Sequence, residues 1–144
     1  MSKVLIIYHS LSGNTEKMAN AVSEGAAKAG ATVILKKAPE ADENDLIDCD
    51  SAVFGTANYF GYEAGMIKDF FDRTFYAARE KVAGKPCATF GSYGGGGDKA
   101  INSLNKLCET MGLKKITESV GALREPSSEA LEECKALGAK MALS

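Results

Sequence analysis

Short apolar segments alternate with amphipathic helical patterns along this chain, and that alternation limits the fold more than any other feature. The apolar segments cover residues 4–8, 32–35, 51–54, 86–90 and 116–120, and the helical patterns run through residues 18–29, 67–75, 101–111 and 131–141. The first segment is continuously hydrophobic, which is typical of a strand covered on both faces. Units in this order predict an α/β fold, with a doubly wound, five-stranded parallel sheet in three layers. A short helical or irregular stretch is expected after Pro39, and we predict one domain over residues 1–144.

Ligands of open parallel sheets bind beyond the carboxyl ends of the strands, near the point where the strand order reverses. Three loops of this chain follow strands at that edge, and they begin at Ser10, Gly55 and Gly91. We therefore expect these three loops to form the binding site.

The first loop has the composition of a phosphate site. It reads Ser10-Leu11-Ser12-Gly13-Asn14-Thr15 and leads directly into a helix. A helix N-terminus presents unpaired N–H groups and a partial positive charge, and the hydroxyl and amide side chains add donors. No Lys or Arg lies within the loop, so a phosphate ester would be held by dipoles and hydrogen bonds alone. The alternative is that Ser12 or Asn14 only caps the helix.

The other two loops suit a flat ligand. The second, Gly55-Thr56-Ala57-Asn58-Tyr59-Phe60-Gly61-Tyr62, places aromatic rings at a strand end, where exposure is costly unless a ligand covers them. The alternative is that these rings pack on the neighbouring helix. The third, Gly91-Ser92-Tyr93-Gly94-Gly95-Gly96-Gly97-Asp98, has four successive glycines that allow close approach to a ring edge, unless it is merely a flexible surface loop. Tyr93 is positioned to stack on such a ring, and Asp98 is expected to cap the next helix.

Composition excludes several functions. The net charge is −2 and the pI is about 5.5, whereas a general nucleic-acid binder carries a basic stripe. No apolar run approaches the roughly 20 residues of a membrane span, and no signal peptide is recognisable, so we expect a cytoplasmic protein that does not bind membranes. The acidic stretch from Glu40 to Asp50 is expected to be a solvated surface segment, with a docking patch for a basic partner as the alternative.

Several kinds of site are absent from the sequence. There is no Walker-type phosphate loop, and no G-x-G-x-x-G follows the first strand. A phosphate-accepting receiver domain would need an Asp where Gly55 and Thr56 stand, and a cysteine phosphatase would need a Cys in the first loop. The four cysteines form no C-x-x-C pair and there is one His, so we expect buried, reduced thiols and no metal site; they are Cys49, Cys87, Cys108 and Cys134.

Together these segments make the chain resemble the flavodoxin family over essentially its whole length. The resemblance rests on Tyr8-His9 with the first loop, the aromatic-glycine loop, and Gly91-Ser92-Tyr93-Gly94. It implies a flavodoxin-like sheet with strand order 2-1-3-4-5 and noncovalently bound FMN. By position, the phosphate would be held by Ser10, Ser12, Gly13, Asn14 and Thr15. The ring would be flanked by Thr56, Ala57, Asn58, Tyr59, Phe60 and Gly61, and closed on its other side by Ser92, Tyr93, Gly94 and Gly97. Gly61 would be the flexible position where a peptide turns its carbonyl toward the flavin.

Two features depart from the family pattern. The segment from Gly55 to Gly65 looks more like NAD(P)H:quinone oxidoreductases of the tryptophan-repressor-binding-protein type, although the chain has no room for the extra segments that build their tetramer and substrate pocket. The net charge is also less negative than in flavodoxins that serve as carriers.

The resemblance therefore implies a low-potential carrier that shuttles single electrons between a reductase donor and an oxidoreductase acceptor, as a monomer without catalytic side chains. The phosphate and nearby carboxylates would make full reduction of the flavin harder. The alternatives are an FMN-dependent NAD(P)H:quinone or nitro-compound reductase, and a flavodoxin-like module without flavin. No residues stand out for a nicotinamide pocket, and the intact first loop argues against the flavin-free module. His9 is expected to be a packed or solvated neighbour of the site.

Overall fold

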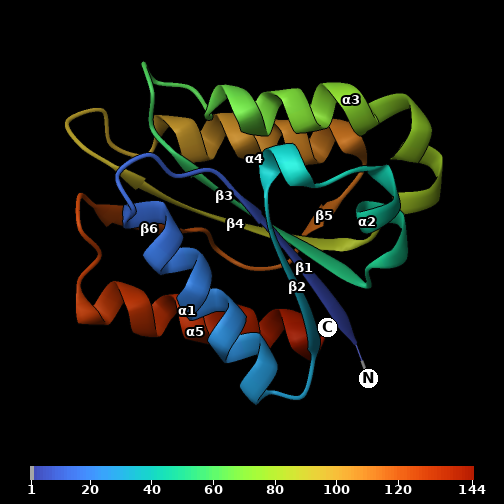
Figure 1. Cartoon of the computed structure of the whole chain (residues 1–144), viewed down its shortest axis with the longest axis horizontal. Coiled ribbons are helices and arrows are strands. Elements are labelled where there is room, and N and C mark those ends of the chain that lie inside the picture. The colour runs from blue at the N-terminus through green and yellow to red at the C-terminus, as the bar shows by residue number, and fades with distance from the viewer. Residues whose placement is uncertain (1) are drawn as a thin grey trace.

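The computed structural model describes residues 2–144 and contains a parallel sheet between two layers of helices (Figure 1). Its strands are β1 (Lys3–Tyr8), β2 (Thr32–Lys37), β3 (Ser51–Ala57), β4 (Pro86–Tyr93), β5 (Lys114–Lys115) and β6 (Val120–Leu123). The strand order is β2-β1-β3-β4-β5, and β6 also pairs with β4. This confirms the predicted order 2-1-3-4-5, with two short strands sharing the fifth position.

The four long helices divide evenly between the two faces of the sheet, as Figure 1 shows. α1 (Asn14–Lys28) and α5 (Ser128–Ala142) cover one face, and α3 (Gly65–Val82) and α4 (Lys99–Met111) cover the other. A 3₁₀ turn, η1 (Ala38–Glu40), and the short α2 (Glu43–Asp48) follow β2, where the sequence predicted a helical or irregular stretch. Across residues 2–144, no helix is long and apolar enough to span a bilayer.

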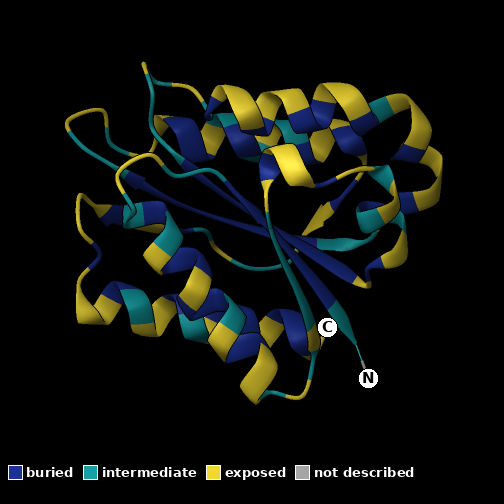
Figure 2. Ribbon diagram, in the orientation of Figure 1, coloured by how far each residue is buried: buried dark blue, intermediate teal, exposed yellow. Residues whose placement is uncertain are grey.

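Two hydrophobic cores hold these layers together, one on each side of the sheet. Along β1, Leu5 and Ile7 point to the core under α3 and α4, whereas Val4 and Ile6 point to the core under α1 and α5. This alternation explains the continuous apolar run, since a central strand needs hydrophobic residues on both faces. Figure 2 shows the central strands buried along their length.

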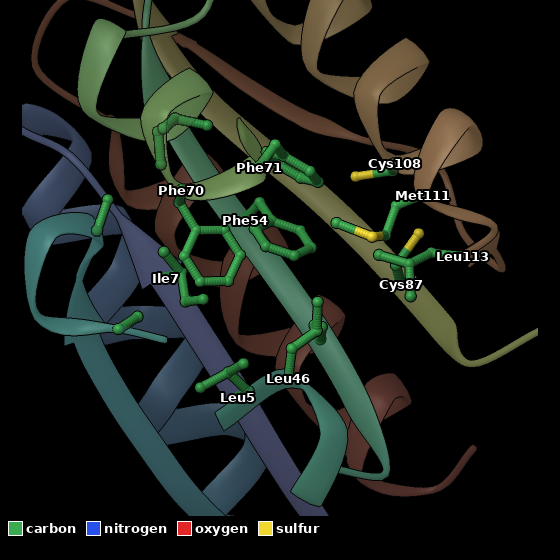
Figure 3. Close-up of a cluster of buried hydrophobic side chains, with 14 of the residues drawn as sticks. Leu5, Ile7, Leu46, Phe54, Phe70, Phe71, Cys87, Cys108, Met111 and Leu113 are labelled. Atoms are coloured by element: carbon green, nitrogen blue, oxygen red, sulfur yellow. The ribbon is translucent and has the colours of Figure 1, made fainter. Parts of the chain in front are cut away.

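The core under α3 is built around aromatic rings. The ring centroids of Phe54 of β3 and Phe71 of α3 lie 5.0 Å apart, and Phe71 packs edge-on against Phe70, also of α3 (Figure 3). Such ring pairs add about 0.5–1.5 kcal/mol each beyond the area they bury. Three cysteines belong to this core, and two of them, Cys87 and Cys108, lie at one end of it (Figure 3). All four cysteines of the chain are buried free thiols, as predicted.

Two strands extend further toward the carboxyl edge than their apolar runs predict. β3 continues to Ala57 and β4 to Tyr93, because Thr56 pairs with Gly91 and Ala57 with Ser92 in the parallel ladder. The predicted second and third loops therefore begin inside strands. This places their first residues on rigid backbone.

The prediction of one edge strand over residues 116–120 was wrong. β5 pairs with Pro86 and Cys87, and β6 resumes pairing at Phe90, so two residues of β4 face the four residues 116–119. Continuous register is impossible with this mismatch. In the intervening segment the Ile116 amide still donates to the Cys87 carbonyl at 3.2 Å. Beyond it side chains make the contacts, because the Thr89 hydroxyl lies 2.6 Å from both Ser119 Oγ and Asn105 Oδ1.

Candidate functional site

The first loop ends at a helix terminus that no side chain caps. Gly13 occupies the N-cap position of α1 with a left-handed φ of 96°, and the first amide that bonds back to it is that of Lys17. Ser10 Oγ accepts from the Gly13 amide at 3.0 Å, which closes a turn within the loop. The Ser12 hydroxyl reaches the Asn14 amide only at 3.5 Å, too long for a cap. The capping alternative is therefore wrong, and the start of α1 keeps its capacity for an anion.

Thr15 ties the first loop to the third. Its hydroxyl lies 2.7 Å from that of Ser92, and both side chains are buried. A buried hydroxyl pair of this kind satisfies both groups without water. The bond joins the start of α1 to the end of β4 and so connects the first loop with the third.

Thr56 joins the two ends of the second loop, and a two-residue turn forms the tip of this loop. Thr56 Oγ1 accepts from the Ala64 amide and donates to the Ala57 carbonyl, both at 2.8 Å. Tyr59 and Tyr62 exchange backbone hydrogen bonds, and between them Phe60 and Gly61 have φ values of 58° and 82°. These values describe the I′ type of hairpin turn, in which a glycine is the ordinary second residue but a phenylalanine is a costly first one.

The third loop uses its glycines in different ways. A side chain on Gly96 would collide with Asn58 Nδ2, whereas Gly94 and Gly95 face open space. The close approach that the glycines were predicted to allow is therefore, at Gly96, an approach to Asn58 of the second loop rather than to a ligand. Asp98 occupies the N-cap position of α4, but its side chain makes no capping hydrogen bond, so the predicted cap was wrong. Its backbone dihedrals, φ −91° and ψ 20°, lie outside the extended conformation that capping requires.

The three loops surround one hollow at the carboxyl edge of the sheet. Its volume is about 170 Å³, and its walls are formed by Ser12, Asn14, Ala57, Asn58, Tyr59, Ser92, Tyr93, Gly94 and Arg124. Every lining residue except Arg124 belongs to the set predicted from the sequence. Ser10, Gly13 and Thr15 do not line the hollow but support residues that do. Gly13 lies between Ser12 and Asn14 and is bonded to Ser10, and Thr15 is bonded to Ser92. The remaining predicted residues lie elsewhere: Thr56 inside the second loop, Phe60 and Gly61 at its tip, and Gly97 beyond the hollow.

One polar atom in the hollow has no partner. Asn58 Oδ1 is buried and unbonded, the sole such side-chain atom between Ser2 and Ser144. A buried acceptor without a donor costs about 1–3 kcal/mol. A ligand that donates a hydrogen bond here would remove that cost.

The aromatic side chains around the hollow differ in orientation. Tyr59 is partly buried and meets His9 edge-on at 5.9 Å, and burial raises the pKa of its hydroxyl. Phe60 is fully exposed, so it does not pack on a neighbouring helix, and Tyr62 is mostly exposed. Tyr93 lies against Gly121 of β6, where a Cβ would come within 2.9 Å of its ring. Burial lowers the pKa of His9, which favours its neutral form, and its contact with Tyr59 makes it a packed neighbour of the site, as expected.

Arg124 is the lining residue that sequence reasoning missed. It follows β6 with a left-handed φ of 56°, and its amide donates to the Tyr93 carbonyl at 2.7 Å. The next residue, Glu125, pairs with Lys17 of α1 at 2.8 Å, which holds this turn beside the first loop. A cation far along the chain therefore borders a loop that contains none. The one available signal was its position directly after the last strand, at the same carboxyl edge as the three loops.

Comparison with known proteins identifies the architecture. The flavodoxin family model matches residues 6–138 of the chain. The chain belongs to the flavodoxin family. It is accordingly a flavoprotein of the electron-transfer type, and members of the flavodoxin family pass electrons between redox partners.

Individual relatives agree with this assignment. A flavodoxin of Aquifex aeolicus is 34% identical, with 99% of this chain and 86% of that protein covered. The NAD(P)H dehydrogenase (quinone) 3 of Rhizobium meliloti is 35% identical over 78% of this chain and 65% of its own length. Among solved structures, a flavodoxin from the domain Archaea superposes with a TM-score of 0.89 at 27% identity, covering 98% of this chain and 96% of that one.

Proposed function

We propose that this flavodoxin-family chain binds FMN in the hollow and transfers single electrons between redox proteins. The observation that carries the proposal is the uncapped start of α1, which opens into the same hollow as the unpartnered Asn58 oxygen. The start of α1 favours an anion, and the Asn58 oxygen needs a hydrogen-bond donor. A flavin mononucleotide combines both, with a phosphate at one end and hydroxyl and ring N–H groups beyond it.

The residues present fit that group. The amides at the start of α1, with Ser10, Ser12 and Asn14, would hold the phosphate. Asn58 would accept from the ligand, and Tyr59 with Tyr93 would border the ring. The hollow is smaller than the roughly 300–1,000 Å³ of pockets that enclose a ligand, so one ring edge would stay outside. FMN would supply the redox chemistry when bound, and the exposed edge would serve electron exchange.

The proposal is tested by reconstituting the purified protein with FMN and reducing it without oxygen. We expect a yellow protein that dithionite reduces in two separate one-electron steps and that NADPH alone does not reduce. Rapid NADPH oxidation with a quinone acceptor would instead support the activity named for the Rhizobium meliloti relative. A protein that rejects added FMN would contradict both.

Arg124 provides a finer prediction about the hollow. No carboxylate pairs with its guanidinium in the described chain, and it shares the hollow with Ser12 and Asn14. We expect Arg124→Gly to weaken FMN binding about tenfold, equivalent to about 1.4 kcal/mol, because a positive charge near the phosphate is lost. Glycine accepts the left-handed backbone of this position, so the fold should be retained. Fluorescence titration with FMN and with riboflavin measures the effect, and equal losses for both ligands would contradict a role at the phosphate.

A further inference from the structure

A second hollow lies on the outer side of the aromatic turn, against α4. We call it the turn–α4 groove, and its volume is about 560 Å³. On α4 its wall is a single helix face, since residues three, four and seven apart project to the same side. The lining residues are Phe60, Gly61, Tyr62, Lys99, Asn102, Ser103 and Lys106.

The aromatic wall of the groove is exposed to an unusual degree. The Phe60 side chain is fully exposed and that of Tyr62 is 67% exposed. The paired backbone bonds of the turn hold Phe60 outward in a left-handed conformation that phenylalanine rarely adopts. No packing within the described residues accounts for this arrangement. A protruding ring fits a concave partner surface better than it fits a small ligand, which would cover only one of its faces.

The charged wall of the groove is positive. Lys99 and Lys106 are exposed and have no ion-pair partner in the part of the chain described here. Two carboxylates lie near them: Glu63 accepts a hydrogen bond from Ser103, and Asp98 directly precedes Lys99 on the chain. Lys99 and Lys106 are the charged residues that line the groove, and the Glu63 carboxylate is bound to Ser103 between them.

The acidic stretch was predicted to be a solvated surface segment, with a docking patch as the alternative, and its helix α2 lies away from this groove (Figure 1). α2 occupies the end of the molecule opposite the three loops (Figure 1). One of its carboxylates, Asp45, is bound to Lys36 at 2.9 Å, and Asp50 accepts from the Lys3 amide at the amino edge of the sheet. Asp45 and Asp50 are thus held by contacts away from the loops where a flavin would be exposed.

We propose that the turn–α4 groove is the docking surface for an electron-transfer partner with an acidic face. This rests on the proposed function, because the turn continues from Asn58 and Tyr59 and so places a docked protein beside the flavin edge. The partner would present carboxylates to Lys99 and Lys106 and a pocket to Phe60. Opposite charges at such a surface steer encounter and raise the association rate.

The test compares two forms of one haem protein that differ in charge. Cytochrome c is basic, and succinylation of its lysines makes it acidic while keeping the haem. Dithionite-reduced, FMN-loaded protein is mixed with each ferric form in a stopped-flow instrument, and one electron passes from flavin to iron. We expect faster reduction of the succinylated form at low salt, with a rate that falls as salt is added.

Variants of the groove should remove this preference. Lys99→Gln with Lys106→Gln should slow reduction of the succinylated form at least tenfold at low salt, and Phe60→Ala should slow it at all salt concentrations. The matched control, Lys81→Gln with Lys140→Gln, changes net charge equally at exposed sites away from the groove and should leave the rate within about twofold. Unchanged rates in the groove variants, or faster reduction of the basic form by the unmodified protein, would overturn the proposal.

Docking can also be measured without a flavin. Each cytochrome is titrated into ¹⁵N-labelled protein, and the amide signals of residues 60–62 and 99–106 should shift with the succinylated form only. A protein that fails to bind FMN but shows these shifts would contradict the proposed function and support the groove. Shifts confined to α2 would contradict the groove alone.

Discussion

Replacing Ser12 by aspartate should weaken FMN binding at least a hundredfold while leaving riboflavin binding almost unchanged. Ser12 lines the hollow beside the uncapped start of α1 and is itself exposed, so the fold should tolerate the change. A carboxylate about 5 Å from a phosphate charge is disfavoured by about 3 kcal/mol at an effective dielectric constant near 20. Because a phosphate monoester carries close to two charges, a hundredfold loss is a conservative expectation.

The control for this experiment is Ser12→Asn, which has the same shape as the aspartate but no charge. It should cost FMN affinity only a few-fold, so the difference between the two variants isolates the electrostatic effect. Fluorescence titrations at two salt concentrations provide the measurement. If aspartate and asparagine behave alike, or if riboflavin is lost together with FMN, the phosphate does not lie at this loop.

The second large effect concerns stability, at the crossing of α1 and α5. An added Cβ on Gly25 would lie 2.0 Å from the Lys135 carbonyl oxygen, and one on Gly138 would lie 2.0 Å from that of Val22. Alanine normally stabilises a helix interior by about 1 kcal/mol relative to glycine. Here the backbone clash outweighs that gain, since overpacking typically costs about 1–3 kcal/mol and sometimes more. We expect Gly25→Ala to lower the free energy of unfolding by about 3 kcal/mol, and the melting temperature by roughly 10 °C.

Two further variants sharpen this prediction. Gly65→Ala, at the start of α3, adds the same methyl group where no atom lies within 4 Å, and it should leave stability almost unchanged. The double variant Gly25→Ala/Gly138→Ala should lose less free energy of unfolding than the two single variants together. Both clashes lie at the crossing of α1 and α5, so one outward shift of the helices relieves both. Urea unfolding followed by circular dichroism is measured for the unmodified protein, for each of the three single variants (Gly138→Ala included) and for the double variant. Unchanged stability in Gly25→Ala would mean that the helices are not in the close contact described.

Much of the fold followed from hydrophobic periodicity. The residues of β1 alternate between the two cores, and this local pattern predicted a doubly covered strand. The broken edge strand did not follow, because residues 114–123 are interrupted by a mismatch with β4 and by the contacts of Thr89 with Ser119, neither of which is local in sequence. Side-chain networks between distant segments leave no periodic signal.

The candidate site shows the same division. Hydroxyls, glycines and aromatics clustered in three loops predicted the wall of the hollow, since topology brings strand ends together. Arg124 was missed because its place depends on the turn after β6 and on the Lys17–Glu125 pair. The pairing of Thr15 with Ser92 was also unforeseen, since their residue types and positions predicted contacts with a ligand, whereas the two hydroxyls bond to each other.

The break in the edge strand also affects whether strands of other molecules can pair with this sheet. Beside β4, the outer position consists of two pairing segments, one of two residues and one of four, and the shorter segment is a pair of exposed lysines. At the other edge, β2 ends in Lys36 and Lys37. A long, flat and uncharged edge is a template for adding strands from other molecules, whereas short, interrupted and lysine-bearing edges are not. Both borders of this sheet should therefore resist edge-to-edge aggregation, even at high protein concentration.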